Sequence, residues 1–206
     1  MEAEVVCSGG AGATGLFRVT IVLWASPASC PARTGGVTVI SVVAFHLDAD
    51  VTHPPDFDLV RGGGLVCFTD SDALAATEAR LVRTGYDLVS LECGTWDEDS
   101  MHRELANALE FPDYYGHNLD ATHDCLYDVA HGDYGWNPSR TGLAITLRNF
   151  GTFSRCESST AQGLVAAAAH CSRDGLLFGH RIIWLLLDET RSSPLEIAGW
   201  QVPLIR

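Results

Sequence analysis

The sequence predicts an α/β fold in which a small parallel β-sheet is packed with helices. Residues 86–93, 143–150 and 182–187 are apolar segments of strand length, and helical segments separate each from the next. The last of the three holds six consecutive apolar residues, which is typical of a strand covered on both faces. Strands that alternate with helices pair in parallel through right-handed crossovers.

Residues 1–36 are rich in Gly, Ala, Ser and Pro and show no periodic pattern. We predict a disordered or mis-annotated extension for this segment. Residues 16–25 are apolar enough for the core of an export signal, but Glu2 and Glu4 stand where such a signal carries positive charge.

Residues 37–85 are predicted to be an N-terminal α+β extension of unknown role, either a small separate domain or part of the same sheet. Residues 37–46 are β-branched and apolar, as in a buried strand, and residues 48–58 contain two adjacent prolines, as in a loop or an edge. Glycines 62–64 precede residues 65–68. Because the Lys and Ser/Thr of a phosphate-binding loop are absent, we expect a turn into a strand there.

Two helices are predicted on either side of residues 86–93. The first is capped by Asp70 and runs to Thr84. The second begins with the capping pattern of residues 95–98, Thr-Trp-Asp-Glu, and cannot continue past Pro112. Their predicted core-facing residues are Leu74, Leu81 and Val82 in the first helix and Met101, Leu105, Ala108 and Leu109 in the second.

Asn118 is predicted to cap a third helix that begins near Leu119. Its buried stripe consists of Leu119, Thr122, Leu126 and Val129. Its exposed row consists of Asp120, Asp124, Tyr127 and His131. Two like charges one turn apart weaken a helix by roughly 0.3 kcal/mol, so helix stability does not account for them. They indicate a positively charged partner.

The rest of the chain is predicted to continue the alternation. After the strand at residues 143–150, Ser159 and Gln162 form a capping box that opens an Ala-rich helix, and Gly175 closes this helix. Residues 191–206 are predicted to form a C-terminal arm or one more strand.

The charge of the chain is strongly negative and unevenly distributed. The net charge is −13, and between Asp87 and Asp133 there are twelve Asp and Glu residues against one Arg. Nucleic acids and anionic membranes are themselves polyanions, so we expect neither as a partner and predict a basic protein instead. No run approaches the roughly 18 apolar residues that a membrane-spanning helix needs.

The seven cysteines are scattered and show no metal-ligand spacing. Cys67, Cys93 and Cys125 lie in or beside apolar runs. We predict that they are small core residues of a protein in a reducing cytosol, and hence that the protein is cytoplasmic. We expect no cofactor.

Residues 111–126 read Phe-Pro-Asp-Tyr-Tyr-Gly-His-Asn-Leu-Asp-Ala-Thr-His-Asp-Cys-Leu. This segment resembles the signature of the barstar family, whose members are intracellular inhibitors of a small bacterial ribonuclease that the cell secretes. The resemblance extends to the Arg and Phe of residues 148–150 and covers roughly residues 86–190, about half of the chain. It implies a barstar-like domain with about three parallel strands and packed helices.

The resemblance also implies a function. The chain would be a non-enzymatic inhibitor that blocks the RNA-binding cleft of a small basic, guanyl-preferring ribonuclease with carboxylates that mimic RNA phosphates. Asp124 falls on the family's main phosphate-mimicking carboxylate, Asp120 on its helical neighbour and Tyr114 on an aromatic of the binding loop. The other candidate partner-binding residues are Gly116, Asn118, Leu119, Ala121, His123, Tyr127 and His170.

Two of these positions depart from the family pattern. His123 stands where the family's prototype has a Trp, and an ungapped alignment places His170 where the second helix of the family contributes an acid. A histidine at that position would make binding depend on pH. A different ribonuclease, or a different basic toxin, is then an open alternative as the target.

Other functions are compatible with the same residues. Asp120 and Asp124 could be part of an ordinary solvated helix face. His117, Asp120 and Asp124 lie within two helical turns and could serve a metal-dependent hydrolase, although the chain has neither an H-E-x-x-H motif nor a second ligand cluster. An acidic immunity protein against a nuclease toxin of another fold is a further alternative.

Overall fold

The computed structural model describes residues 3–7, 19–23, 54, 56–197 and 199–206. The chain divides into two compact units, residues 1–52 and residues 53–206. In the first unit, β1 (Ala3–Cys7) and β2 (Val19–Leu23) pair in antiparallel orientation. The strand predicted for residues 37–46 lies outside the described residues, and the extension predicted for residues 1–36 stays a prediction.

The second unit is built on a five-stranded parallel sheet. Its strands, in spatial order, are β4 (Tyr86–Glu92), β5 (Gly142–Arg148), β6 (Ile182–Leu187), β3 (Leu65–Phe68) and β9 (Leu204–Ile205). The predicted α/β class is confirmed, but the predicted count of about three strands is too low. β3 comes from the segment before residue 86, and β9 comes from the C-terminal arm, so both join the sheet through pairings distant in sequence.

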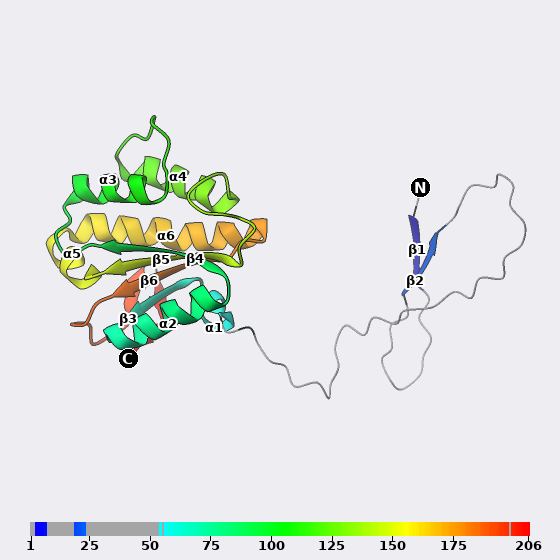
Figure 1. Cartoon of the computed structure of the whole chain (residues 1–206), viewed down its shortest axis with the longest axis horizontal. Helices are drawn as coiled ribbons and strands as arrows, with labels where there is room; N and C mark the ends of the chain where they lie inside the picture. Colours follow the sequence, from blue (N-terminus) through cyan, green and yellow to red (C-terminus); the bar gives the residue numbers. More distant parts are fainter. Residues whose placement is uncertain (1–2, 8–18, 24–53, 55, 198) are drawn as a thin grey trace, which may run out of the picture. The chain divides into compact units, whose positions relative to one another are not determined.

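Helices cover both faces of this sheet (Figure 1). α1 (Phe57–Arg61) and α2 (Ser71–Arg83) lie on one side, while α3 (Glu98–Ala108), α4 (Leu119–His131) and α6 (Ser158–Phe178) lie on the other. α5 (Phe150–Cys156) joins β5 to α6, and α4 packs along α6. The remaining strands, β7 (Leu195–Ile197) and β8 (Trp200–Val202), form a separate antiparallel pair.

The core has two parts, one on each face of the sheet. Successive side chains of a strand point to opposite faces. Accordingly, Leu65 and Cys67 of β3 belong to the cluster beneath α3, α4 and α6, whereas Val66 and Phe68 belong to the cluster with α2 residues. Every residue of β6 is buried, which confirms that this strand is covered on both faces.

Several element boundaries differ from those predicted. Asp97, and not Thr95, is the N-cap of α3, because its carboxylate accepts a hydrogen bond from the backbone N–H of Ser100 at 2.8 Å while the Ser100 hydroxyl accepts one from the N–H of Asp97. α6 runs beyond Gly175 to Phe178 and ends at Gly179. Gly175 is buried within the helix, where a Cβ would lie 3.2 Å from Ile182, so this glycine allows close packing.

Three further predictions about local structure differ in part from the structure. The strand predicted over residues 143–150 ends at Arg148, because Asn149 adopts a φ of 55° and α5 begins at Phe150. Residues 57 and 58 of the predicted loop or edge belong to α1, while residues 48–53 and 55 of that segment lie outside the described residues. The Val82 side chain is 50% exposed, although it was expected in the core.

The cysteines expected in the core are confirmed there. Cys67, Cys93 and Cys125 are buried free thiols. Burial raises the pKa of the Cys67 thiol to about 11, so this side chain stays neutral and acts as a small apolar group. In the described ranges, no helix is both long and apolar enough to cross a membrane.

Candidate partner-binding surface

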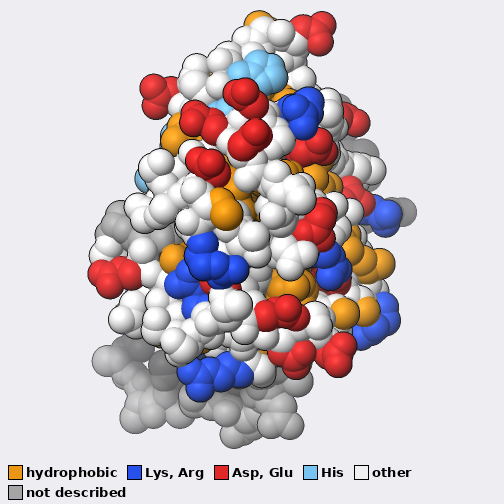
Figure 2. All heavy atoms as spheres, turned by 90° about the vertical axis from the view of Figure 1, so that its left-hand side faces the viewer, with side chains coloured by type: hydrophobic (Ala, Val, Ile, Leu, Met, Phe, Trp, Pro, Cys, Tyr) orange, Lys and Arg blue, Asp and Glu red, His pale blue; other side chains and the backbone are white. Residues whose placement is uncertain are grey.

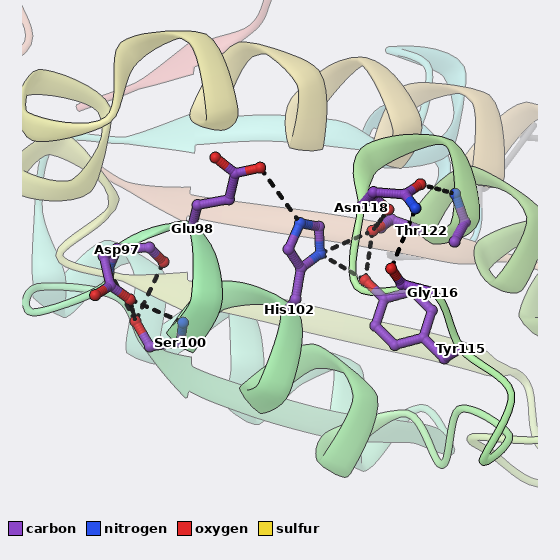
Figure 3. A network of polar contacts seen from close by, with 9 residues as sticks. Asp97, Glu98, Ser100, His102, Tyr115, Gly116, Asn118 and Thr122 are labelled. Carbon is purple, nitrogen blue, oxygen red and sulfur yellow. Dashed lines mark hydrogen bonds and ion pairs between the residues drawn. The ribbon is translucent and has the colours of Figure 1, made fainter.

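The loop between α3 and α4 is held to both helices by Tyr115 (Figure 3). The Tyr115 hydroxyl lies 2.6 Å from His102 Nδ1 of α3 and 2.6 Å from Thr122 Oγ1 of α4. Thr122 in turn donates a hydrogen bond to the backbone carbonyl of Asn118 at 2.9 Å. All three side chains of this network are buried. The loop is therefore fixed relative to the helix that follows it.

Packing between aromatic rings also holds the same loop in place. The ring of Phe111 lies edge-on to that of Tyr115, with 5.0 Å between the ring centroids, and Tyr134 packs edge-on to Phe111 at 6.2 Å. The Tyr134 hydroxyl donates a hydrogen bond to the backbone carbonyl of Cys125 in α4 at 3.1 Å. Of the two adjacent tyrosines, Tyr115 is thus the buried anchor, and Tyr114 remains 80% exposed.

Asn118 caps α4, as predicted. Its Oδ1 accepts a hydrogen bond from the backbone N–H of Ala121 at 2.9 Å, and its amide group donates one to the carbonyl of Gly116 at 3.1 Å. These bonds join the loop to the first turn of the helix. Asn118 and Gly116 therefore shape the surface by fixing the backbone of the loop against the first turn of α4.

Residues on the inner face of α4 fix the helix against α6. Its buried residues are Thr122, Cys125, Leu126, Val129 and Ala130. Leu119 is half-buried and contacts α6 at Gly163, where a Cβ would lie only 2.4 Å from Leu119 Cδ1. Ala121 is also half-buried and packs against the core. Leu119 and Ala121 thus position the helix.

The outer face of α4 carries the acidic row. Asp120 and Asp124 are both exposed. Neither carboxylate makes a hydrogen bond or an ion pair within the part of the chain that the structure describes. Acidic side chains are also numerous in the upper part of the face drawn in Figure 2, where an Arg side chain lies among them, and the lower part of this face carries both acidic and Arg side chains. The two aspartates are free to bind cations from outside.

α6 adds a second row beside the acidic one. The rings of His123 on α4 and His170 on α6 lie edge-on, with centroids 5.4 Å apart, so the structure brings these two predicted residues together. Asp174 and Phe178 follow His170 at intervals of four residues and therefore lie on the same side of α6. Sequence reasoning missed both of them, although the helical spacing from His170 is visible in the sequence.

His102 couples the anchored loop to pH. Burial lowers the pKa of its imidazole, and the exposed carboxylate of Glu98, 3.9 Å from His102 Nε2, acts in the opposite direction. The pKa of His102 is lower in the folded state than in the unfolded state, where it is about 6.5. The contribution of His102 to the free energy of unfolding is therefore complete above about pH 6.5 and is lost as the pH falls from there towards the folded pKa. The neutral ring is the form that fits the network.

We therefore expect the protein to unfold more easily at pH 5.5 than at pH 7.5, and expect His102→Asn to reduce this difference. One proton taken up on unfolding contributes at most about 1.4 kcal/mol per pH unit. Urea unfolding of the wild type and of His102→Asn at both pH values measures the effect. An equal pH dependence in the two proteins would show that His102 does not contribute.

The residues considered as metal ligands, His117, Asp120 and Asp124, do not form a metal site in the described structure. In the described ranges, no group of three or more His, Cys, Asp and Glu side chains could hold a metal ion. His117 instead packs its ring against Tyr115, with centroids 4.8 Å apart. The candidate residues form an open surface of a loop and two helices.

Comparison with known proteins bears on this surface. Residues 86–183, which contain the loop, α4 and α6, match the sequence profile of the Barstar (barnase inhibitor) family. This segment is a barstar-family region. The resemblance predicted from residues 111–126 is therefore confirmed.

One curated relative supports the same assignment. The chain is 44% identical over 50 residues to the protein named "Putative ribonuclease inhibitor YrdF" of Bacillus subtilis (strain 168), a match that covers 24% of this chain. The chain spans 45% of the length of that relative. The name of the matching family and the name of this relative both refer to an inhibitor.

Proposed function

We propose that this protein inhibits a small basic, guanyl-preferring ribonuclease by placing Asp120, Asp124 and Tyr114 in its RNA-binding cleft. The observation that carries the proposal is the pair of exposed carboxylates on α4, which have no partner among the described residues and stand beside an anchored loop with an exposed tyrosine. The barstar match over residues 86–183 agrees with it.

The chemistry of the cleft explains why such a surface inhibits. A ribonuclease must hold phosphates with Arg, Lys and His side chains, and carboxylates can accept the same charge-assisted hydrogen bonds. Unlike RNA, the helix that carries the carboxylates contains no phosphodiester bond that the nuclease could cleave. Because α4 is packed on α6 and its first turn is capped, the backbone that carries these carboxylates is ordered before binding, which lowers the entropic cost of association.

The candidate residues divide into two groups in this proposal. The side chains that contact the nuclease are Tyr114, Asp120, His123, Asp124, Tyr127 and His170, all of them exposed. The residues that hold the surface in shape are Gly116, Asn118, Leu119 and Ala121. The protein works in this way without catalysis, and we place it in the cytoplasm, where an inhibitor would protect cellular RNA.

A second candidate target is a basic nuclease toxin of another kind. The contact between His123 and His170 favours it, because two imidazoles lie together where the family resemblance implies an indole and a carboxylate. Such a surface would fit a partner with a different arrangement of charge. The carboxylates Asp120 and Asp124 would bind cations in either case.

Titration of a small secreted guanyl-specific ribonuclease with the full chain, followed by RNA cleavage, tests the proposal. We expect stoichiometric inhibition by the wild type and none by the double variant Asp120→Ala/Asp124→Ala. Circular dichroism of both proteins serves as the folding control. Full enzyme activity in the presence of excess folded wild type would reject this target and direct the same titration to other basic nucleases, beginning with those encoded nearby.

A further inference from the structure

An aromatic patch continues the candidate surface beyond Asp124. We define this patch as Tyr127 and His131 of α4 and Leu177 and Phe178 of α6. The Phe178 ring lies edge-on to Tyr127 and to His131, with centroids 5.7 Å and 4.7 Å apart. Tyr127 is 46% exposed, and Leu177 is 82% exposed. The three rings of the patch therefore pack together at the surface, and Leu177 lies next to Phe178 in the chain.

The last turn of α6 presents this patch. The helix passes Gly175 and continues to Phe178 before Gly179, with a φ of 83°, ends it. That additional turn carries Leu176, Leu177 and Phe178, all of them exposed. Exposed apolar groups that cluster in this way are typical of contact surfaces for other proteins.

Carboxylates lie along the edge of the patch. Asp124 precedes Tyr127 by three residues on α4, and Asp174 precedes Phe178 by four residues on α6, so each carboxylate lies one turn before a ring of the patch. The Asp133 carboxylate lies 3.0 Å from His131 Nδ1 at the other end. Aromatic faces bordered by carboxylates match one side chain particularly well.

That side chain is arginine. Its guanidinium group stacks on aromatic rings through cation–π attraction while its N–H groups donate hydrogen bonds to carboxylates, and its methylene stem covers apolar surface. A lysine ammonium group is more strongly hydrated and lacks the planar face that stacks. Asp124 also connects the patch directly to the acidic row.

We propose that the aromatic patch is a second subsite of the inhibitory surface and binds an arginine side chain at the rim of the nuclease cleft. The inference rests on the proposed function for the identity of its partner. The chemistry of the subsite depends only on Tyr127, Phe178 and the neighbouring carboxylates.

Substitutions that remove aromaticity but keep apolar volume test the subsite. We expect Tyr127→Leu/Phe178→Leu to raise the dissociation constant for the ribonuclease about fivefold. The control is Val82→Ala, at an exposed apolar residue of α2 on the other side of the sheet, which we expect to leave the constant unchanged. Isothermal titration calorimetry measures the constants, and urea unfolding checks that each variant is folded. A nuclease that binds the wild type and the double Leu variant equally would overturn the inference while leaving the proposed function intact.

A second measurement needs no nuclease and separates the two proposals. We expect the full chain to bind a hexa-arginine peptide more tightly than a hexa-lysine peptide, and expect Tyr127→Leu/Phe178→Leu to abolish this preference. Equal binding of both peptides by the wild type would overturn the subsite. If the ribonuclease fails to bind but the arginine preference and its loss in the variant are found, the subsite stands and only the proposed target is rejected.

Discussion

Replacing Asp124 with alanine is expected to raise the dissociation constant for the ribonuclease at least tenfold, a loss of about 1.4 kcal/mol. In the complex this carboxylate would occupy a pocket built for a phosphate, and its removal leaves desolvated cations without a partner. The fold should not suffer, because the Asp124 side chain is exposed and has no internal partner in the described part of the chain.

The matched control for this prediction is Asp72→Ala. Asp72 is an exposed acid in the first turn of α2, on the opposite side of the sheet, so its loss changes the net charge equally but leaves the candidate surface intact. Calorimetric titration at low and physiological salt separates the specific contact from general attraction, which salt screens. Equal effects of the two substitutions would remove Asp124 from the interface.

Replacing Gly142 with alanine is expected to destabilise the fold by about 3 kcal/mol. Gly142 begins β5, between β4 and β6, and a Cβ there would lie 2.2 Å from the backbone carbonyl oxygen of Arg181 and 2.6 Å from Tyr86 Cε1. This carbonyl directly precedes β6 and accepts a hydrogen bond from the backbone N–H of Leu143, so it cannot move aside as a flexible side chain can. The substitution therefore forces the strands apart where the sheet begins.

Gly179→Ala is the control for this effect. Gly179 has a φ of 83° and open space around its Cβ position, so alanine there carries only a conformational cost of about 1 kcal/mol. Urea unfolding followed by circular dichroism compares both variants with the wild type. A Gly142→Ala protein as stable as Gly179→Ala would mean that β5 and β6 are not packed as closely as described.

The local features of the site could be predicted from the sequence because they depend on neighbours along the chain. Asn118 precedes the helical pattern of α4, and its side chain caps that helix. The spacing of three and four residues separates the exposed Asp120 and Asp124 from the buried Leu126 and Val129. Both kinds of inference require only helix geometry.

The features that sequence reasoning missed depend on tertiary contacts. β3 and β9 join the sheet through pairing with residues more than a hundred positions away, and no local pattern specifies such partners. The network of His102, Tyr115 and Thr122 arises because two helices and a loop converge. In the same way, only the packing of α4 along α6 brings Phe178 to Tyr127.

The central claim is that Asp120 and Asp124 occupy the phosphate-binding cleft of the nuclease, and competition with a guanine mononucleotide tests it most directly. A mononucleotide at ten times its own dissociation constant should raise the apparent dissociation constant of the inhibitor about elevenfold, since the two would exclude each other. Sodium chloride at the same ionic strength is the control, because chloride does not mimic a phosphate group. An apparent dissociation constant that is the same in nucleotide and in chloride would contradict the account, because the acidic surface would then bind outside the cleft.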